Sequence, residues 1–169
     1  MVVGILDIDS FLTQLETDIT DTVVNDCKQV VEEKFHNNSN KIYDEYIPWS
    51  SYGKQYKRRR ENGGYGDKDN ISTQIINNGN GDITLFTSND TKGVGDAKNN
   101  YIDEIIEEGG DKNYTWMHEN GSGKAGIGYP DDFPLPRPVS EWTMNELNET
   151  NIIENTIEKS LKAKGYNVK

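Results

Sequence analysis

Apolar residues recur at intervals of three and four through the first part of the chain, which predicts a long amphipathic helix over residues 9–36. The apolar positions are Ile8, Phe11, Leu12, Leu15, Ile19, Val23, Val24, Cys27, Val30, Val31 and Phe35. Asp9 and Ser10 are suitable N-cap residues. The polar run at residues 36–40 predicts the end of the helix, and the acidic outer face is typical of a solvated surface.

Two short apolar segments, residues 71–76 and 83–87, alternate in the way expected of β-strands. The six residues between them are Asn, Asp and Gly, which tolerate the positive φ angles of a hairpin turn. We also expect a short strand near residues 42–46, followed by an extended arm. The arm and the hairpin together occupy residues 42–88.

The C-terminal half has less regular patterning. A short helix is predicted over residues 101–108, and a long loop rich in Gly, Pro and aromatic residues over 111–138. A final helix is predicted over 140–164, with Ser140 as its cap and Gly165 as its stop. The sequence therefore predicts one α+β domain over residues 1–169, in which long N-terminal and C-terminal helices pack on a small antiparallel sheet.

Charge and composition narrow the classes of protein. Acidic residues outnumber basic ones by 29 to 18, giving a net charge of −11, which argues against a protein that wraps nucleic acid over its whole surface. Only 33% of the residues are hydrophobic, so the core is thin and dependence on partner subunits is plausible. The single cysteine, Cys27, excludes an internal disulfide and is expected to be a small buried hydrophobe.

The sequence shows neither a secretion signal nor a membrane span, so we expect a protein made in the cytosol without membrane association. His36 and His118 have no second His or Cys at metal-ligand spacing. The glycines at residues 121–124 lack the spacing of a phosphate loop, and residues 67–70 lack the later ligands of a calcium loop. We therefore expect no catalytic residue, no metal and no cofactor, and hence no enzyme.

The most distinctive segment is the basic, aromatic arm. Tyr52 and Tyr56 are interleaved with five basic residues: Lys54, Lys57, Arg58, Arg59 and Arg60. Such residues can contact phosphates and stack on bases, and the alternative function is a nucleic-acid-binding module that uses residues 52–60. Arginine also binds carboxylates in a bidentate manner. The strong negative charge of the chain favours this second use, within the chain or between subunits.

Several of these motifs, in order, resemble a family. They are Tyr56-Lys57-Arg58-Arg59, then Gly63-Gly64, Asp67 and Asn70-Ile71, then the stretch 101–109, Tyr114 and Trp116, and finally Pro136-Arg137-Pro138-Val139. The chain is similar over residues 42–165 to the neck and tail-completion proteins of tailed bacteriophages. Tyr65 stands where leucine is common in that family, and Val139 where phenylalanine is common.

The resemblance implies a non-enzymatic virion protein of the neck or tail, assembled in the host cytoplasm, that joins tail to head. It implies a homo-oligomeric ring, hexameric or dodecameric, in contact with neighbouring neck, connector and tail proteins. DNA would pass through this ring without specific binding. The residues that we expect to contact other subunits or partners are Tyr52, Tyr56, Arg58, Arg59, Arg60, Gly63, Gly64, Trp116 and Arg137.

Overall fold

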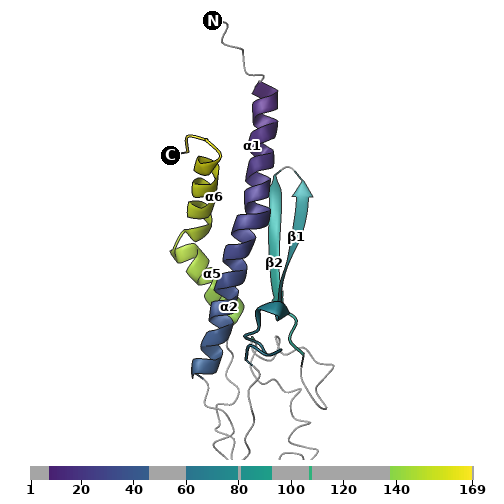
Figure 1. The fold of residues 1–169 in the computed structure, drawn as a ribbon, viewed down its shortest axis with the longest axis vertical. Helices are drawn as coiled ribbons and strands as arrows, with labels where there is room; N and C mark the ends of the chain where they lie inside the picture. The colour runs from purple at the N-terminus through teal and green to yellow at the C-terminus, as the bar shows by residue number, and fades with distance from the viewer. Residues whose placement is uncertain (1–7, 46–59, 80, 93–106, 108–137, 169) are drawn as a thin grey trace, which may run out of the picture.

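A long helical column is the central element of the structure, with the other helices and the hairpin on either side of it (Figure 1). The computed structural model describes residues 8–45, 60–79, 81–92, 107 and 138–168. Helix α1, Ile8–Thr22, runs through a π-helical turn, Val23–Cys27, directly into helix α2, Lys28–Glu45. With a hairpin and two C-terminal helices, this column gives an α+β fold, which confirms the predicted class.

The column is longer than the sequence pattern predicts. The helix passes through the polar residues 36–40, so the predicted stop there is wrong, and so is the predicted strand for the described residues 42–45. The physical reason is burial: Asn38 and Ser39 are fully buried and Ile42 is 7% exposed. Tertiary packing on this turn outweighs the low helix propensity of Asn and Ser.

The predicted hairpin is present. Strand β1, Ile71–Gly79, pairs antiparallel with β2, Asp82–Asn89, with Ile75 opposite Leu85. Gly79 and Gly81 have φ angles of +82° and +78°, which only glycine adopts readily, so they fix the turn. At the base of the hairpin, the face that is turned toward the helical column packs against α2. The side chains become more exposed toward the turn, and Ile75 is already 40% exposed.

The C-terminal helix is broken in two. Helix α5, Val139–Glu149, packs on α2, and helix α6, Ile152–Ala163, packs on α1 and the π-helical turn. They lie on the opposite side of the column from the hairpin (Figure 1). The prediction of one helix over 140–164 is therefore wrong at Asn151, whose φ of +47° is left-handed and bends the chain between α5 and α6. Gly165, at φ +94°, ends α6 as predicted.

The first turn of α5 is bound by a side chain from outside the helix. Both the backbone nitrogen and the Oγ of Ser140 donate to the Glu107 carboxylate at 2.9 Å. Glu107 is helical and belongs to the short helix predicted over residues 101–108, the remainder of which lies outside the described residues. The acceptor at this helix start is therefore Glu107, and Ser140 acts as a donor.

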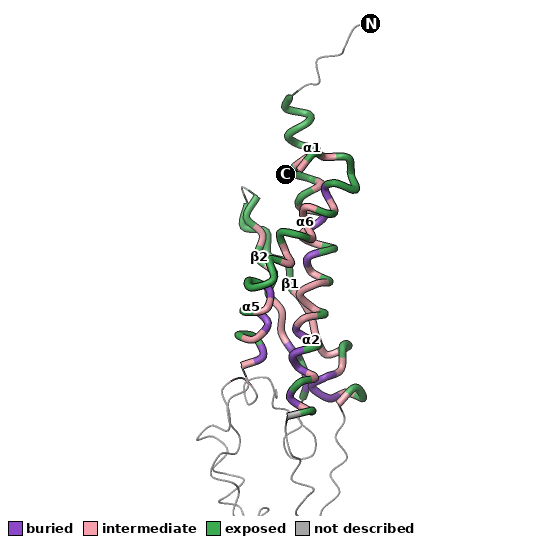
Figure 2. Tube along the Cα trace, turned by 90° about the vertical axis from the view of Figure 1, so that its left-hand side faces the viewer, coloured by how far each residue is buried: buried purple, intermediate pink, exposed green. Residues whose placement is uncertain are grey.

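The core is small and lies in the lower half of the column. Phe35, Ile42, Tyr65 and Val139 form it, with Trp142 packed against them. Buried residues gather around α2 and α5, whereas the first turns of α1 are exposed (Figure 2). Cys27 is buried at 1% exposure, as predicted, and burial raises the pKa of its thiol, helped by the charge of Asp26. None of the described helices is long and apolar enough to cross a membrane.

Polar contacts join the C-terminal helices to the column. Lys164 Nζ lies 2.9 Å from Asp18 Oδ1, and the Tyr166 hydroxyl donates to Asp18 Oδ2 at 2.6 Å. Hydrogen bonds from Lys164, Tyr166 and Gln14 lower the pKa of Asp18 from 3.8 to about 2. Between α5 and α2, Lys34 Nζ lies 2.6 Å from Glu146 Oε1.

Candidate functional site

The loop at residues 60–70, which is the described end of the basic arm, is held closed by one carboxylate. Gly63 donates its backbone N–H to Asp67 Oδ2 at 2.6 Å, and Asp69 donates to Asp67 Oδ1 at 3.1 Å. These two bonds lower the pKa of Asp67, the Gly63 bond contributing most. Gly63 has a φ of +74°, so a glycine suits this position. The spacing of Gly63 and Asp67 in the sequence thus has a local structural cause.

Two carbonyls of the loop bind the base of the hairpin. The Gly64 carbonyl accepts from Asn70 Nδ2 at 2.9 Å and from Thr91 Oγ1 at 3.1 Å. The Tyr65 carbonyl accepts from Asn89 Nδ2 at 2.8 Å. Thr91 and Asn89 are 1% and 2% exposed, so these bonds are shielded from water. They fix the direction in which the hairpin leaves the loop.

The same loop lies close against α2. The Gly66 carbonyl is 3.0 Å from His36 Nε2 and 3.3 Å from Asn40 Nδ2. A Cβ on Gly66 would lie 2.6 Å from Asn40 Oδ1 and 3.2 Å from Tyr43 Cε2. Glycine suits this position because a Cβ would collide with the side chains of Asn40 and Tyr43, which pack directly on the backbone of Gly66.

Arg60 uses its guanidinium group within the chain. Its Nε donates to Asn40 Oδ1 at 2.8 Å, its Nη1 lies 3.1 Å from Asp44 Oδ1, and it stacks over the Tyr43 ring at 5.6 Å. The Tyr43 hydroxyl in turn accepts from the Tyr65 backbone N–H at 2.8 Å. Arg60 is therefore part of the contact between the loop and α2.

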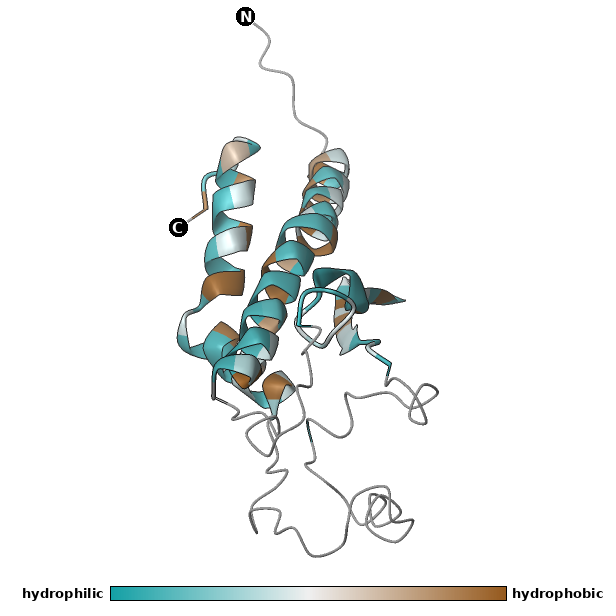
Figure 3. Cartoon of the chain, turned by 60° about the horizontal axis from the view of Figure 1, so that its bottom comes forward, coloured by the Kyte–Doolittle hydropathy of each residue, from teal (hydrophilic) through white to brown (hydrophobic). Residues whose placement is uncertain are grey.

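Exposed apolar side chains gather in two other places. The first, which we call the α1 stripe, consists of Ile8, Phe11, Leu12 and Ile19, exposed by 36% to 70%. The second, which we call the hairpin patch, consists of Ile76 and Phe86 on the outer face of the hairpin, exposed by 45% and 55%, whereas Ile75 points to the opposite face of the strand pair. Figure 3 shows apolar residues along α1 outside the core. Exposed apolar side chains that lie together are a common feature of protein–protein contact sites.

A family model matches residues 7–163, which is nearly the whole chain. The chain belongs to the YomN family. YomN is a phage-derived family related to SPbeta-like Bacillus phages, which indicates a phage origin. No curated protein and no solved structure matches the chain.

The structure places three of the predicted contact residues of this YomN-family chain together. Arg60, Gly63 and Gly64 lie in the closed loop on α2, where they make the contacts given above. The other six lie outside the described residues: Tyr52, Tyr56, Arg58, Arg59, Trp116 and Arg137. Contact of all nine with partner molecules stays a prediction.

Sequence reasoning missed the residues of α2 that receive the loop. His36, Asn40 and Asp44 are spaced by four and lie on one face of the helix. That spacing is visible in the sequence, but it carries a signal only if the helix continues beyond residue 36. Because the helix was predicted to end at residues 36–40, the spacing of His36, Asn40 and Asp44 did not lead to a prediction.

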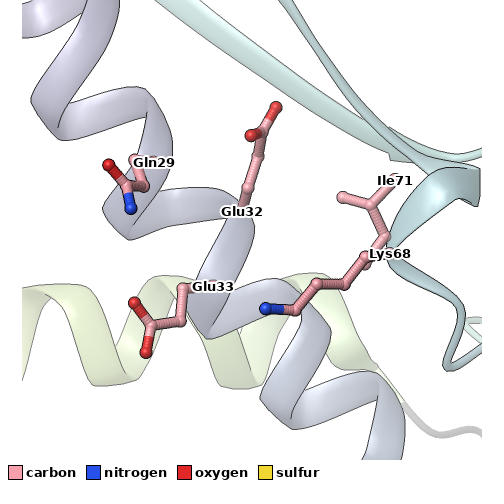
Figure 4. Close-up of a pocket in the computed structure, with 5 residues that line it drawn as sticks. All are labelled: Gln29, Glu32, Glu33, Lys68 and Ile71. Atoms are coloured by element: carbon pink, nitrogen blue, oxygen red, sulfur yellow. The ribbon is translucent and has the colours of Figure 1, made fainter.

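A shallow hollow of about 150 Å³ lies between α2 and the base of the hairpin (Figure 4). Gln29, Glu32, Glu33, Lys68 and Ile71 line it, and Lys68 reaches from the loop toward α2. No group of three or more His, Cys, Asp or Glu side chains among the described residues is placed to hold a metal ion. The hollow is an open depression beside the loop, and the residues that line it come from both the loop and α2.

Proposed function

We propose that this chain is a structural protein of the phage neck, a ring-forming subunit that joins tail to head. In this role it contacts copies of itself and the neighbouring neck, connector and tail proteins, and it carries no catalytic site. The basic arm then serves protein contacts, at Arg60 within the chain and at residues 52–59 between chains, in preference to the nucleic-acid-binding function of residues 52–60 considered as the alternative.

The observation that carries the proposal is the pair of exposed apolar surfaces on a chain of the phage-derived YomN family. Leu12 and Phe86 are more than half exposed, so neither contributes much to the core of the single chain, and both expose apolar surface to water. They are expected in a subunit that is completed by its neighbours.

The geometry of the loop supports the same role. In the motif that resembles neck and tail-completion proteins, the described residues Gly63, Gly64, Asp67 and Asn70 close a loop that anchors the hairpin. Arg60, from the basic run, is bound to Asn40 and Asp44 of the same chain. An arginine in this arrangement stabilises a fold and is not oriented toward phosphates.

The charge of α1 supports a place beside passing DNA. From Ile8 to Cys27 the column carries acidic residues and no Lys or Arg. Acidic side chains that face a channel repel the phosphate backbone, so DNA slides through without sticking.

The test is assembly of particles from a phage that lacks this gene. We expect separate heads and tails in negative-stain images, with joining restored when the protein is supplied from a plasmid. Normal, infectious particles in the absence of the protein would refute the proposal. A plasmid that supplies the chain with Met144→Ala provides a control for expression level, because Met144 lies outside the proposed contact surfaces.

A further inference from the structure

The exposed large apolar side chains of the described residues are not scattered. Six of the eight belong to the α1 stripe or to the hairpin patch, and the other two are Ile75 on the opposite face of the hairpin and Met144 on α5. The two surfaces belong to different elements and have different shapes, one a helix face and the other a strand pair (Figure 1). Two unlike surfaces on one subunit suit a head-to-tail contact, in which each copy offers one surface to each neighbour.

The charge around each surface indicates which pairing is favourable. The only charged residues of the chain from Ile8 to Cys27 are acids, namely Asp9, Glu16, Asp18, Asp21 and Asp26, of which Asp18 is paired with Lys164. Two such helices side by side would bring like charges together, which costs free energy at every pair. Strand β1 carries no charged residue and β2 carries only Asp82. The hairpin can therefore approach the acidic helix with little repulsion.

The hairpin also lacks the features that keep exposed strands apart. A two-stranded hairpin is marginally stable by itself, and natural proteins protect exposed edges with Lys, Pro or inward-pointing charges. Neither β1 nor β2 contains Lys or Pro, and among the described residues the two strands form a sheet of two. Phe86 and Ile76 lie on the outer face, diagonally across the strand pair. This face is suited to burial against another protein.

We propose that the hairpin patch of one copy packs on the α1 stripe of the next copy, and that repetition of this contact closes the ring. This inference rests on the proposed function, since it names the contact by which that ring forms. The sizes agree: the stripe from Ile8 to Ile19 spans about 16 Å at the rise of an α-helix. The distal half of the hairpin, about four residues of strand, spans about 13 Å.

The experiment uses the full chain and two variants that each introduce a negative charge, Leu12→Glu and Phe86→Glu, so that the two altered surfaces repel each other. Leu12 and Phe86 are 53% and 55% exposed, so either change leaves the core untouched. Met144→Glu is the matched control, because Met144 is also 55% exposed but lies on α5, outside both surfaces. Sedimentation velocity gives the mass of each protein, and circular dichroism verifies its fold.

We expect the unmodified chain and Met144→Glu to form the same closed oligomer, and each of the other two variants to remain at the 19.1 kDa monomer mass. An equimolar mixture of Leu12→Glu and Phe86→Glu should then give a species of twice the monomer mass. The first variant retains its hairpin patch and the second retains its α1 stripe, so one intact contact forms and cannot propagate.

Several results would overturn the inference. They are an unmodified chain that stays monomeric at its highest soluble concentration, normal assembly of Leu12→Glu or Phe86→Glu, or a mixture that contains only monomers. If Phe86→Glu fails to fold, Thr84→Glu on the same outer face replaces it, since Thr84 is already polar and exposed. Unjoined heads and tails without the gene, together with normal assembly of both variants, would refute this contact alone. Normal particles without the gene would refute the neck function alone.

Discussion

The contact between α2 and α5 rests on a small polar cluster whose disruption has a calculable cost. Lys34 Nζ lies 2.6 Å from Glu146 Oε1, and Asn38 Nδ2 donates to Thr143 Oγ1 at 3.0 Å and to Glu146 Oε2 at 3.4 Å. The Lys34 hydrogen bond is the largest contribution that lowers the pKa of Glu146. Replacing Lys34 by Met keeps the apolar stem of the side chain and removes its charge.

We expect Lys34→Met to lower the free energy of unfolding by about 1.5 kcal/mol. A hydrogen bond to a charged group contributes about 1.5 to 3 kcal/mol, and the lower end applies here because water reaches both partners. The side chains of Lys34 and Glu146 are 23% and 31% exposed. Lys28→Met is the matched control on the same helix. Lys28 pairs with Glu32 one turn away at 3.8 Å, a type of pair that contributes about 0.2 to 0.5 kcal/mol.

Urea denaturation followed by circular dichroism measures both costs, at one protein concentration because assembly adds apparent stability. Lys34→Met should lower the free energy of unfolding by about 1 kcal/mol more than Lys28→Met does. The double variant Lys34→Met with Glu146→Met should recover much of the loss, because it leaves no unpaired carboxylate against α2. Equal losses in the free energy of unfolding for Lys34→Met and Lys28→Met would refute the conclusion that the Lys34–Glu146 pair stabilises the contact between α2 and α5.

Three further predictions concern other contacts. Gly66→Ala should destabilise the fold by about 1 to 3 kcal/mol, because its Cβ displaces Asn40, and thermal denaturation will measure the loss. The pKa of Asp18 is lowered to about 2 in the folded state, so the stability that it contributes is present above pH 3.8 and is lost as the pH falls toward 2. The thermal midpoint of the unmodified chain should therefore fall more steeply across that range than the midpoint of Asp18→Asn, and equal slopes would contradict this. The buried Cys27 thiol should react slowly with an aromatic disulfide reagent in the native state and rapidly in urea, and similar rates would contradict its burial.

The elements that the sequence predicted correctly are those specified by local chemistry. The hairpin follows from alternating residues and from glycines at 79 and 81, whose positive φ angles are turn requirements. The end of α6 follows from Gly165. In each case the deciding interactions lie within a few residues of one another, so the pattern alone contains them.

The elements that it missed depend on distant partners. Asn38 is helical because its side chain is buried against Thr143, more than a hundred residues later in the chain. No local preference of Asn favours that conformation. The last predicted helix contains several asparagines, and the sequence does not indicate at which of them the helix breaks. The packing of α6 on α1 determines that the break is at Asn151. Long-range packing decided both cases.

The loop at residues 60–70 connects these observations with the proposed assembly. The loop is fixed to α2 through Gly66 and Arg60, and it holds the hairpin base through Asn89 and Thr91. The direction of the hairpin relative to α1 is therefore set at its base, far from the apolar residues that we assign to the subunit contact. A ring closes only if every copy presents its two surfaces at the same angle, because a small error repeats at each subunit. The buried hydrogen bonds of this loop give the otherwise exposed hairpin a fixed base, which is what the proposed ring requires of each subunit.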